Sequence, residues 1–386
     1  MSGSSGNQIS WFSEGGAEAV AERIKAFFDR SDRFGWEGTI GSGANGSVYK
    51  VKYNSEEGSW ILAVKICHID VDLDGNKSYD EDDEDEGDEV LQLANEKLWL
   101  ERLRSCPHII QSFDVNDDPL RQTPYDLAPH RMRTWIFTEY IDNGPLTRLV
   151  RRHTELYEGE LFPCRLLWRF FMCLIRFCLE MAYCDAHQDG RVDLNTATLE
   201  SLRELPIGFL AHKDLSRSNI AVGGLLSALQ HPEHDMNPIL KLLDFGTAAV
   251  MDPSDPRSLD DFNRTGPQRN ISDIGEVMEY LILQEDEMMN ETATVPIGVS
   301  VVETFAGSLH AARDDLIARG VDAQLIDLVY CCRVVDPERQ PGLIDLAIAV
   351  RNWVSNRGDY GVERETDGAI QQRVANLMYN AETGST

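Results

Sequence analysis

The sequence is poor in positive charge. Its 386 residues include 36 Lys and Arg but 65 Asp and Glu, so the formal net charge is −29. We therefore expect no binding of nucleic acid or of an anionic membrane through overall charge. Much of the excess is local, because the insert at 70–89 holds twelve acidic residues and one Lys. Such a composition predicts a solvated acidic loop.

The same insert offers one alternative to a plain acidic loop. From Asp70 to Glu81 it fits the calcium-loop spacing Asp-x-Asp-x-Asp-Gly-x₅-Glu, in which carboxylates supply oxygen ligands. Such a calcium loop follows a helix, whereas this one follows a predicted strand. Lys77 also stands where these loops carry an apolar residue. We therefore favour the solvated loop over a calcium site.

Long apolar runs are also missing. No run approaches the ~20 residues that span a bilayer, and the first residues lack the basic and apolar stretches of a secretory signal. The eight cysteines lie mostly among apolar neighbours, which predicts buried thiols in a reducing compartment. Cys331 and Cys332 could instead form a redox or metal pair, although buried thiols are favoured. We expect a soluble protein of the cytoplasm or nucleus.

Hydrophobic periodicity predicts an α+β fold of two lobes, a small antiparallel sheet with one main helix and a larger, mostly helical lobe. In the small lobe we expect a helix over 88–104 and strands over 36–69, 109–115 and 135–141. In the large lobe we expect helices over 161–187, 278–283, 325–333 and 343–354. The expected parts are an extension at 1–33 with an amphipathic helix over 14–31, a lobe at 34–142, a lobe at 143–356 with polar inserts at 188–206 and 223–238, and a tail at 357–386.

The amphipathic helix of the extension places Val20, Ile24 and Phe27 or Phe28 on one face. This face could pack on the rest of the protein or hold a partner. Packing is favoured.

A glycine-rich turn lies between the first two predicted strands. Gly41, Gly43, Gly46 and Val48 form the pattern Gly-x-Gly-x-x-Gly-x-Val. A dinucleotide fingerprint would open a helix here, but the chain continues as a strand, and the Gly-Lys-Ser/Thr of a P-loop is missing. The pattern therefore predicts a strand–turn–strand flap whose backbone N–H groups approach phosphates closely.

A lysine follows in the middle of an apolar strand. Lys65 of Ala63-Val64-Lys65 would be costly to bury without a counter-charge. Glu96 supplies that charge from the predicted helix over 88–104, where it is polar among apolar residues. The alternative is an edge-strand lysine that faces water.

Two later motifs carry acids and a carboxamide. His212-Lys213-Asp214 is followed by Asn219, and Asp244 opens Asp-Phe-Gly. An Asp at this position can take a proton from a substrate hydroxyl. Asn219 and Asp244 offer the oxygen ligands that Mg²⁺ prefers.

In this order the motifs resemble those of the eukaryotic protein kinase family over roughly 34–355. The resemblance implies ATP and Mg²⁺ as cofactors, with Asp214, Lys65 and Glu96 as the catalytic residues and Asn219 and Asp244 as the metal ligands. It implies a gatekeeper at Thr138 and main-chain bonds from Glu139 and Ile141 to adenine. The implied ATP-binding residues are Ile40, Gly41, Gly43, Gly46, Val48, Ala63, Lys65, Thr138, Glu139 and Ile141.

The chain departs from the family at several positions. Lys213 stands where the family has Arg, and Ser216 where Ser/Thr kinases have Lys, although the neighbouring Arg217 could substitute. No Ala-Pro-Glu lies between residues 247 and 270, and Asn270 stands where the family has Asp. The segment at 334–341 resembles the family's late Asp-Pro-x-x-Arg-x-Pro motif, with Arg339 as its arginine, and the glutamate that would pair with Arg339 is missing. These departures concern the positions that serve regulation by loop phosphorylation and the docking of a protein substrate in the family.

These motifs indicate transfer of phosphate from ATP to Ser or Thr of a protein. Two alternatives stay open: a nucleotide-binding pseudokinase or scaffold, and a small-molecule kinase of the same superfamily. We expect ATP and a protein substrate as partners, with no nucleic acid and no membrane. His231 and His234 suggest zinc, but a polar surface insertion is favoured, since no Cys or further His is close in sequence.

Overall fold

The computed structural model describes residues 16–43, 46–67, 86–121, 134–225, 234–286 and 291–379. The calcium-loop pattern, most of the acidic insert and His231 lie outside these residues. The chain forms two compact units, which we describe separately. The first comprises residues 1–104, 110–140 and 245–247, and the second comprises residues 105–109, 141–244 and 248–386.

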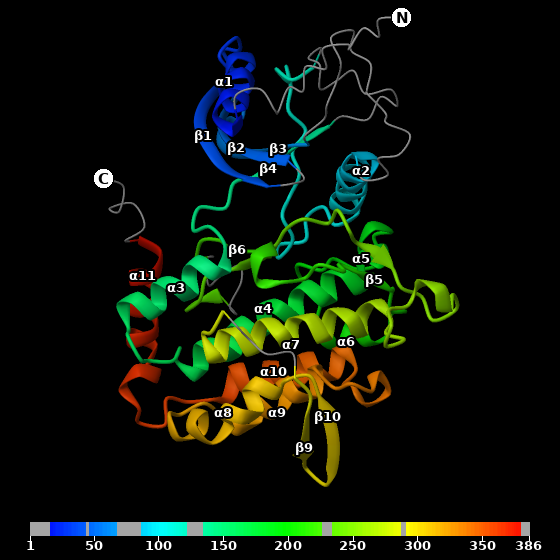
Figure 1. The fold of residues 1–386 in the computed structure, drawn as a ribbon, viewed down its shortest axis with the longest axis vertical. Helices are drawn as coiled ribbons and strands as arrows, with labels where there is room; N and C mark the ends of the chain where they lie inside the picture. The colour runs from blue at the N-terminus through cyan, green and yellow to red at the C-terminus, as the bar shows by residue number, and fades with distance from the viewer. Residues whose placement is uncertain are drawn as a thin grey trace, which may run out of the picture. The chain divides into compact units, whose positions relative to one another are not determined.

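The first unit is a four-stranded antiparallel sheet with two helices (Figure 1). The strands follow the order β1-β2-β3-β4. The elements are α1 (Gly16–Phe28), β1 (Phe34–Gly43), β2 (Gly46–Ser55), β3 (Gly58–Ile66), α2 (Glu86–Arg102) and β4 (Trp135–Glu139). The helix predicted over 88–104 is confirmed, and it begins inside the acidic insert, at Glu86.

The N-terminal helix packs on one face of this sheet (Figure 1). Val20, Ile24 and Phe28 recur at helical spacing, are at most 2% exposed, and form one cluster with sheet residues such as Tyr49 and Phe137. Period-two alternation brings these sheet residues to the same face. The predicted packing of α1 is therefore confirmed, and α1 belongs to the sheet's core.

The strand predicted over 109–115 is wrong. Ile109 forms a single parallel bridge with Leu242, and Ser112 forms a single antiparallel bridge with Thr138. Ile109 belongs to the second unit and Ile110 to the first, so this apolar run is divided between two sets of hydrogen bonds. Composition favours a strand here, but no single neighbour accompanies the run for its whole length.

The second unit is mostly helical. Its helices are α3 (Leu146–Leu156), α4 (Cys164–Ala182), α5 (Cys184–Gln188), α6 (Leu199–Arg203), α7 (Gly266–Leu283), α8 (Gly307–Ala318), α9 (Ala323–Cys332), α10 (Leu343–Asn356) and α11 (Asp367–Tyr379). Three short antiparallel pairs accompany them: β5 (Leu210–Ala211) with β8 (Ala249–Val250), β6 (Ile220–Val222) with β7 (Leu240–Leu242), and β9 (Ala293–Ile297) with β10 (Ser300–Thr304).

Helix α4 lies at the centre of this unit, packed against α7 and α10 (Figure 1). Seventeen of its 19 residues are buried, so it is covered on all sides and not on a single stripe. The single helix predicted over 161–187 is wrong in extent. It starts after the N-cap Pro163 and ends at Ala182, and α5 follows as a separate turn. No helix among the described residues is long and apolar enough to cross a membrane.

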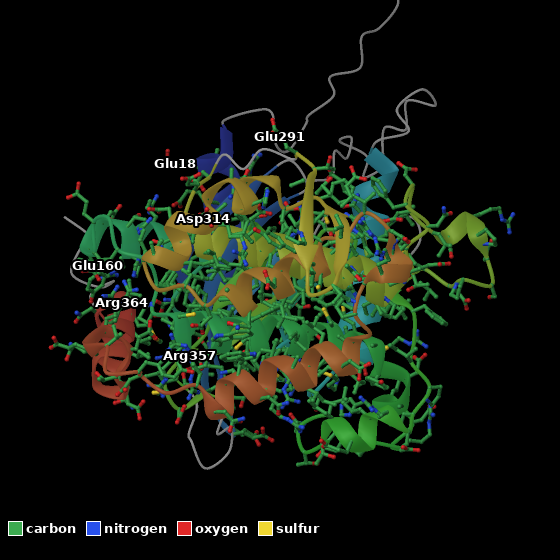
Figure 2. The ribbon with its side chains drawn as sticks, turned by 90° about the horizontal axis from the view of Figure 1, so that it is seen from below. Glu18, Glu160, Glu291, Asp314, Arg357 and Arg364 are labelled. Carbon is green, nitrogen blue, oxygen red and sulfur yellow. The ribbon has the colours of Figure 1, made fainter. Side chains whose placement is uncertain are left out.

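The segment expected as a tail belongs to the second unit. Buried Glu365 accepts the N–H groups of Cys164 (2.7 Å) and Arg165 (3.0 Å), which open α4, and it pairs with buried Arg357 (3.3 Å). Helix α11 packs on α3, and Glu160 and Arg364 lie beside it (Figure 2). A carboxylate at a helix N-terminus satisfies N–H groups that have no partner within the helix. The end of the chain therefore caps the central helix.

We predict that Glu365→Ala lowers the free energy of unfolding by about 2–3 kcal/mol, because it leaves buried N–H groups without an acceptor. Glu363→Ala, two residues away and exposed, should change it by less than about 0.5 kcal/mol. Urea unfolding followed by circular dichroism measures both variants. Equal stability of the two variants would contradict the capping role.

Candidate active site

In the first unit, the sheet face opposite α1 collects the residues predicted to bind a nucleotide. The register aligns Val48 with Lys65, and Ala63 with Thr138. Since their neighbours Tyr49 and Val64 point into the α1 core, these four side chains share the other face. Ala63 and Thr138 are buried and Val48 is half-buried, which gives an apolar floor next to the lysine. Ile40, on β1, is 47% exposed.

The glycine flap is closed by β1 and β2, whose last pair is Gly43 with Gly46. Gly46 has φ +149°, and a Cβ there would lie 2.4 Å from the carbonyl oxygen of Ile66. Any other residue would collide with β3. Gly41 has open space around it. The chain at 44–45, the tip of the flap, lies outside the described residues.

Lys65 forms an ion pair with Glu96. Its Nζ lies 2.8 Å from Oε2 of Glu96, whose side chain is only 5% exposed, while that of Lys65 is 22% exposed. A carboxylate buried to this extent needs a partner, and the ammonium supplies it. The pair holds the end of Lys65 in a fixed place on the open face of the sheet.

A neighbouring side chain on α2 was missed by sequence analysis. Asn95 donates through Nδ2 to the carbonyl oxygens of Phe245 (3.3 Å) and Gly246 (2.9 Å), which belong to the first unit. Phe245 itself is fully buried. Asn95 therefore ties the last two residues of Asp-Phe-Gly to the helix that carries Glu96. A carboxamide directly before Glu96 is the sequence signal for this role.

The predicted hinge begins at the end of β4. The N–H of Glu139 donates to the carbonyl oxygen of Gln111 (2.9 Å), and the Glu139 carboxylate accepts the N–H of Gln111 (2.9 Å). Both the N–H and the carboxylate of Glu139 are thus engaged with the main chain of Gln111. Ile141 is the first hinge residue that belongs to the second unit.

In the second unit, Asn219 and Asp244 flank one small two-stranded ribbon, and Asp214 lies in the loop that precedes it. Strand β6 begins after Asn219, β7 ends before Leu243, and Ile220 pairs with Leu242. The N–H of Leu243 donates to the carbonyl oxygen of Asn219 (2.8 Å). Asn219 and Asp244 therefore leave the ribbon at the same end, where they offer a carboxamide oxygen and a carboxylate. These are the ligands that a hard cation such as Mg²⁺ requires.

The carboxamide of Asn219 is oriented by Asp214. Its Nδ2 donates to Oδ2 (2.7 Å) and to the main-chain oxygen (2.9 Å) of Asp214. The remaining atom, Oδ1, is the one that can bind a cation. Asp214 is exposed, as a residue that meets an acceptor hydroxyl must be.

His212 links the loop that carries Asp214 to the segment that carries Asp244. It is fully buried, and its Nε2 donates to the carbonyl oxygen of Leu243 (2.8 Å). Burial lowers the pKa of His212, so the ring is neutral and the Nε2–H tautomer is the one that fits this bond. Lys213 and Asp244 adopt positive φ of 65° and 58°. Such values are uncommon outside glycine and recur at functional loops.

Asn270 of α7 anchors the same loop. Its Oδ1 accepts the N–H of His212 (3.0 Å), and its Nδ2 donates to the carbonyl oxygen of Leu210 (2.8 Å). The side chain is fully buried. A carboxamide fits both partners, whereas a carboxylate would face the Leu210 oxygen with no hydrogen to donate.

The residues that depart from the family pattern have other partners. Arg217 lies over the Tyr280 ring (4.4 Å to its centroid) and donates to the carbonyl oxygen of Asp286 (2.8 Å), so its guanidinium is held by these groups. Ser216 shares a hydrogen bond with Ser218 (2.7 Å). Arg339 donates to the carbonyl oxygen of Val301 (2.9 Å). The loop that carries Asp214 therefore has a hydroxyl, Ser216, where the resemblance to Ser/Thr kinases predicts a lysine.

A cavity of about 510 Å³ adjoins the loop that follows Asp214. Ser216, Arg217 and Ser218 line it on one side, and Glu276 and Tyr280 of α7 line it on another. Its lining is mixed in charge and rich in hydroxyl groups. It lies entirely within the second unit and is suited to a polar ligand.

A comparison of the chain with models of known protein families finds no match. A comparison with curated protein sequences finds no match either.

We predict that Asn270→Asp destabilises the protein by about 1–3 kcal/mol, because a buried carboxylate would oppose the Leu210 carbonyl oxygen. Asn356→Asp is the matched control, since Asn356 makes the same kind of Nδ2-to-carbonyl bond but is exposed. Thermal unfolding monitored by circular dichroism compares the two. An Asn270→Asp protein as stable as the wild type would contradict the anchoring role.

Proposed function

We propose that the protein transfers the γ-phosphate of ATP to a hydroxyl, most simply a Ser or Thr of a protein, and that its two units are the lobes of a protein-kinase-like fold. The observation that carries the proposal is the placement of Asn219 and Asp244 at one end of the β6–β7 ribbon, with Asp214 bonded to Asn219. The Lys65–Glu96 pair supports it from the first unit.

The first unit binds and orients ATP in this proposal. The flap glycines Gly41, Gly43 and Gly46 bring main-chain N–H groups to the phosphates. Val48 and Ala63 enclose the adenine, for which the shared sheet face is suited. Lys65, held by Glu96, neutralises charge on the α- and β-phosphates.

The second unit carries the chemical step. Asp214 accepts the proton of the attacking hydroxyl, and Asn219 keeps the Asp214 carboxylate in place. Asn219 and Asp244 would hold Mg²⁺, which when bound neutralises the charge that develops on the phosphate oxygens. The acceptor approaches over the cavity beside Ser216 and Ser218.

A second candidate function is nucleotide binding without transfer, as in a pseudokinase that acts as a scaffold. This function is supported by the residues that follow Asp214. Ser216 is uncharged, and the guanidinium of Arg217 lies over the Tyr280 ring and donates to the carbonyl oxygen of Asp286. A transferring enzyme with this loop would stabilise the γ-phosphate through bound Mg²⁺, with no side-chain cation from positions 216 and 217. Both functions bind ATP, so only a transfer assay separates them.

We predict that Lys65→Met and Asp244→Ala lower phosphate transfer at least about 100-fold, since the first removes the ammonium that neutralises the phosphates and the second removes a carboxylate that would hold Mg²⁺. Lys52→Met, an exposed lysine of β2 outside the site, should retain wild-type transfer. Incubation with Mg²⁺ and labelled ATP, alone and with generic protein acceptors, measures this. An Asp244→Ala protein that transfers labelled phosphate as well as the wild type would contradict the enzymatic proposal.

Label that appears only on added sugars or amino alcohols would assign the chain to the small-molecule kinases. ATP binding with no transfer to any acceptor would establish the pseudokinase function.

We further predict that, if the protein phosphorylates itself between residues 247 and 270, the phosphate is attached to Ser254. Ser254 is exposed. The Ser258 hydroxyl donates to the carbonyl oxygen of Asp255 (2.7 Å), and Thr265 is held in a capping box with Gln268. Mass spectrometry after incubation with Mg-ATP locates the phosphate. Label on Ser258 or Thr265 with Ser254 unmodified would contradict this order of accessibility.

A further inference from the structure

A cluster of potential metal ligands is buried in the second unit, apart from the residues discussed above. His108, Cys173 and His234 are each at most 2% exposed, and their ligand atoms lie within 4.8 Å of one another. They come from three separate stretches: the loop that follows α2, the middle of α4, and the segment that leads into β7. The prediction that His234 belongs to a polar surface insertion is therefore wrong.

We propose that His108, Cys173 and His234 bind one Zn²⁺ ion. Two imidazoles and one thiolate form a ligand set that zinc takes in proteins. The Nε2 atoms of His108 and His234 are 3.1 Å apart. Two nitrogens on a tetrahedral zinc with ordinary bond lengths are about 3.3 Å apart. The two rings are thus already placed almost as a shared ion requires.

A buried carboxylate orients His108 in the manner typical of zinc ligands. Glu180 of α4 lies 2.8 Å from Nδ1 of His108 and also accepts its main-chain N–H (3.1 Å). The Nδ1 side of the ring is thereby occupied, and Nε2 is turned toward His234. Carboxylate–histidine–metal triads recur because the carboxylate fixes the tautomer and raises the basicity of the ligating nitrogen.

Asn237 completes the surroundings of the cluster. Its Nδ2 lies 3.5 Å from Sγ of Cys173. Nδ2 also lies 3.2 Å from Nδ1 of His234; zinc at Nε2 of His234 puts the ring hydrogen on Nδ1, so this contact would be lost when the ion binds. An amide N–H that points at sulfur stabilises the thiolate form. Its Oδ1 is buried and has no hydrogen-bond partner in the part of the chain that the structure describes. This oxygen, or a water bound to it, is a suitable fourth donor.

The ion would connect its ligands to the strand that leads to Asp244. The main-chain oxygen of His108 accepts the N–H of Leu242 in β7 (2.8 Å). Zinc bound to His108 and His234 would therefore fix β7 from the loop beside it and from the segment that precedes it. Burial of all three ligands closes the site to bulk solvent. Its role is to stabilise, and this inference does not depend on the proposed phosphate transfer.

The first test is metal analysis of the full-length wild-type protein, reconstituted with ZnCl₂ under reducing conditions and freed of excess metal by gel filtration. We expect about one zinc per chain by mass spectrometry of the metal content. We also expect a lower melting temperature after removal of the metal by a chelator, because metal binding stabilises the folded form. CoCl₂ in place of zinc should give the charge-transfer absorption of a cobalt–thiolate bond.

Variants then locate the ion. Cys173→Ser and His234→Gln should each weaken zinc binding at least about tenfold and abolish the cobalt–thiolate absorption or reduce it strongly. The matched control is Cys178→Ser, since Cys178 is also buried on α4 but lies outside the cluster. It should retain one zinc per chain.

Two results would overturn the proposal without any variant. One is a reconstituted wild-type protein that holds no stoichiometric zinc and whose melting temperature does not respond to zinc or chelator. The other is cobalt binding without thiolate absorption. The three side chains would then be a hydrogen-bonded polar cluster of the core. A Cys173→Ser protein that folds and binds zinc as tightly as the wild type would also contradict the assignment.

Discussion

Buried polar side chains that bond to the main chain of a distant segment hold the second unit together. The side chain of Asn270 in α7 forms hydrogen bonds with the main chain of His212 and Leu210. The carboxylate of Glu180 in α4 accepts the main-chain N–H of His108, and that of Glu365 accepts N–H groups of the first turn of α4. Each joins segments that are far apart in sequence. Because a buried polar group without a partner costs about 1–3 kcal/mol, each bond fixes both of the segments that it joins.

This arrangement explains how a short loop can keep an uncommon backbone. Lys213 and Asp244 have positive φ, and neither is a glycine. The main chain around them is held through His212, by Asn270 on one side and by the Leu243 oxygen on the other. Strained residues persist where their surroundings leave no alternative. The geometry offered to a metal or a hydroxyl thus depends on residues that would touch neither.

Most of the correct predictions came from the periodic spacing of apolar and charged residues in the sequence. Spacing alone predicted the apolar face of α1, and the free-energy cost of burying charge predicted the pair between half-buried Lys65 and Glu96. The strand predicted over 109–115 failed because local composition does not show that the chain changes unit at Ile110. His234 was misplaced for a related reason. Its partners Cys173 and His108 lie 61 and 126 residues away in sequence, a separation that no local motif reveals.

The path of the chain between the two units has a consequence for biosynthesis. The chain passes from one unit to the other five times, after Arg104, Ile109, Tyr140, Asp244 and Thr247. The first unit is therefore incomplete until Phe245 and Gly246 have left the ribosome, although its sheet ends at Glu139. Domains usually fold one after another during translation, starting with the N-terminal one. Here more than a hundred residues of the second unit are synthesised after the last strand of the sheet and before Phe245 and Gly246, which Asn95 of α2 contacts.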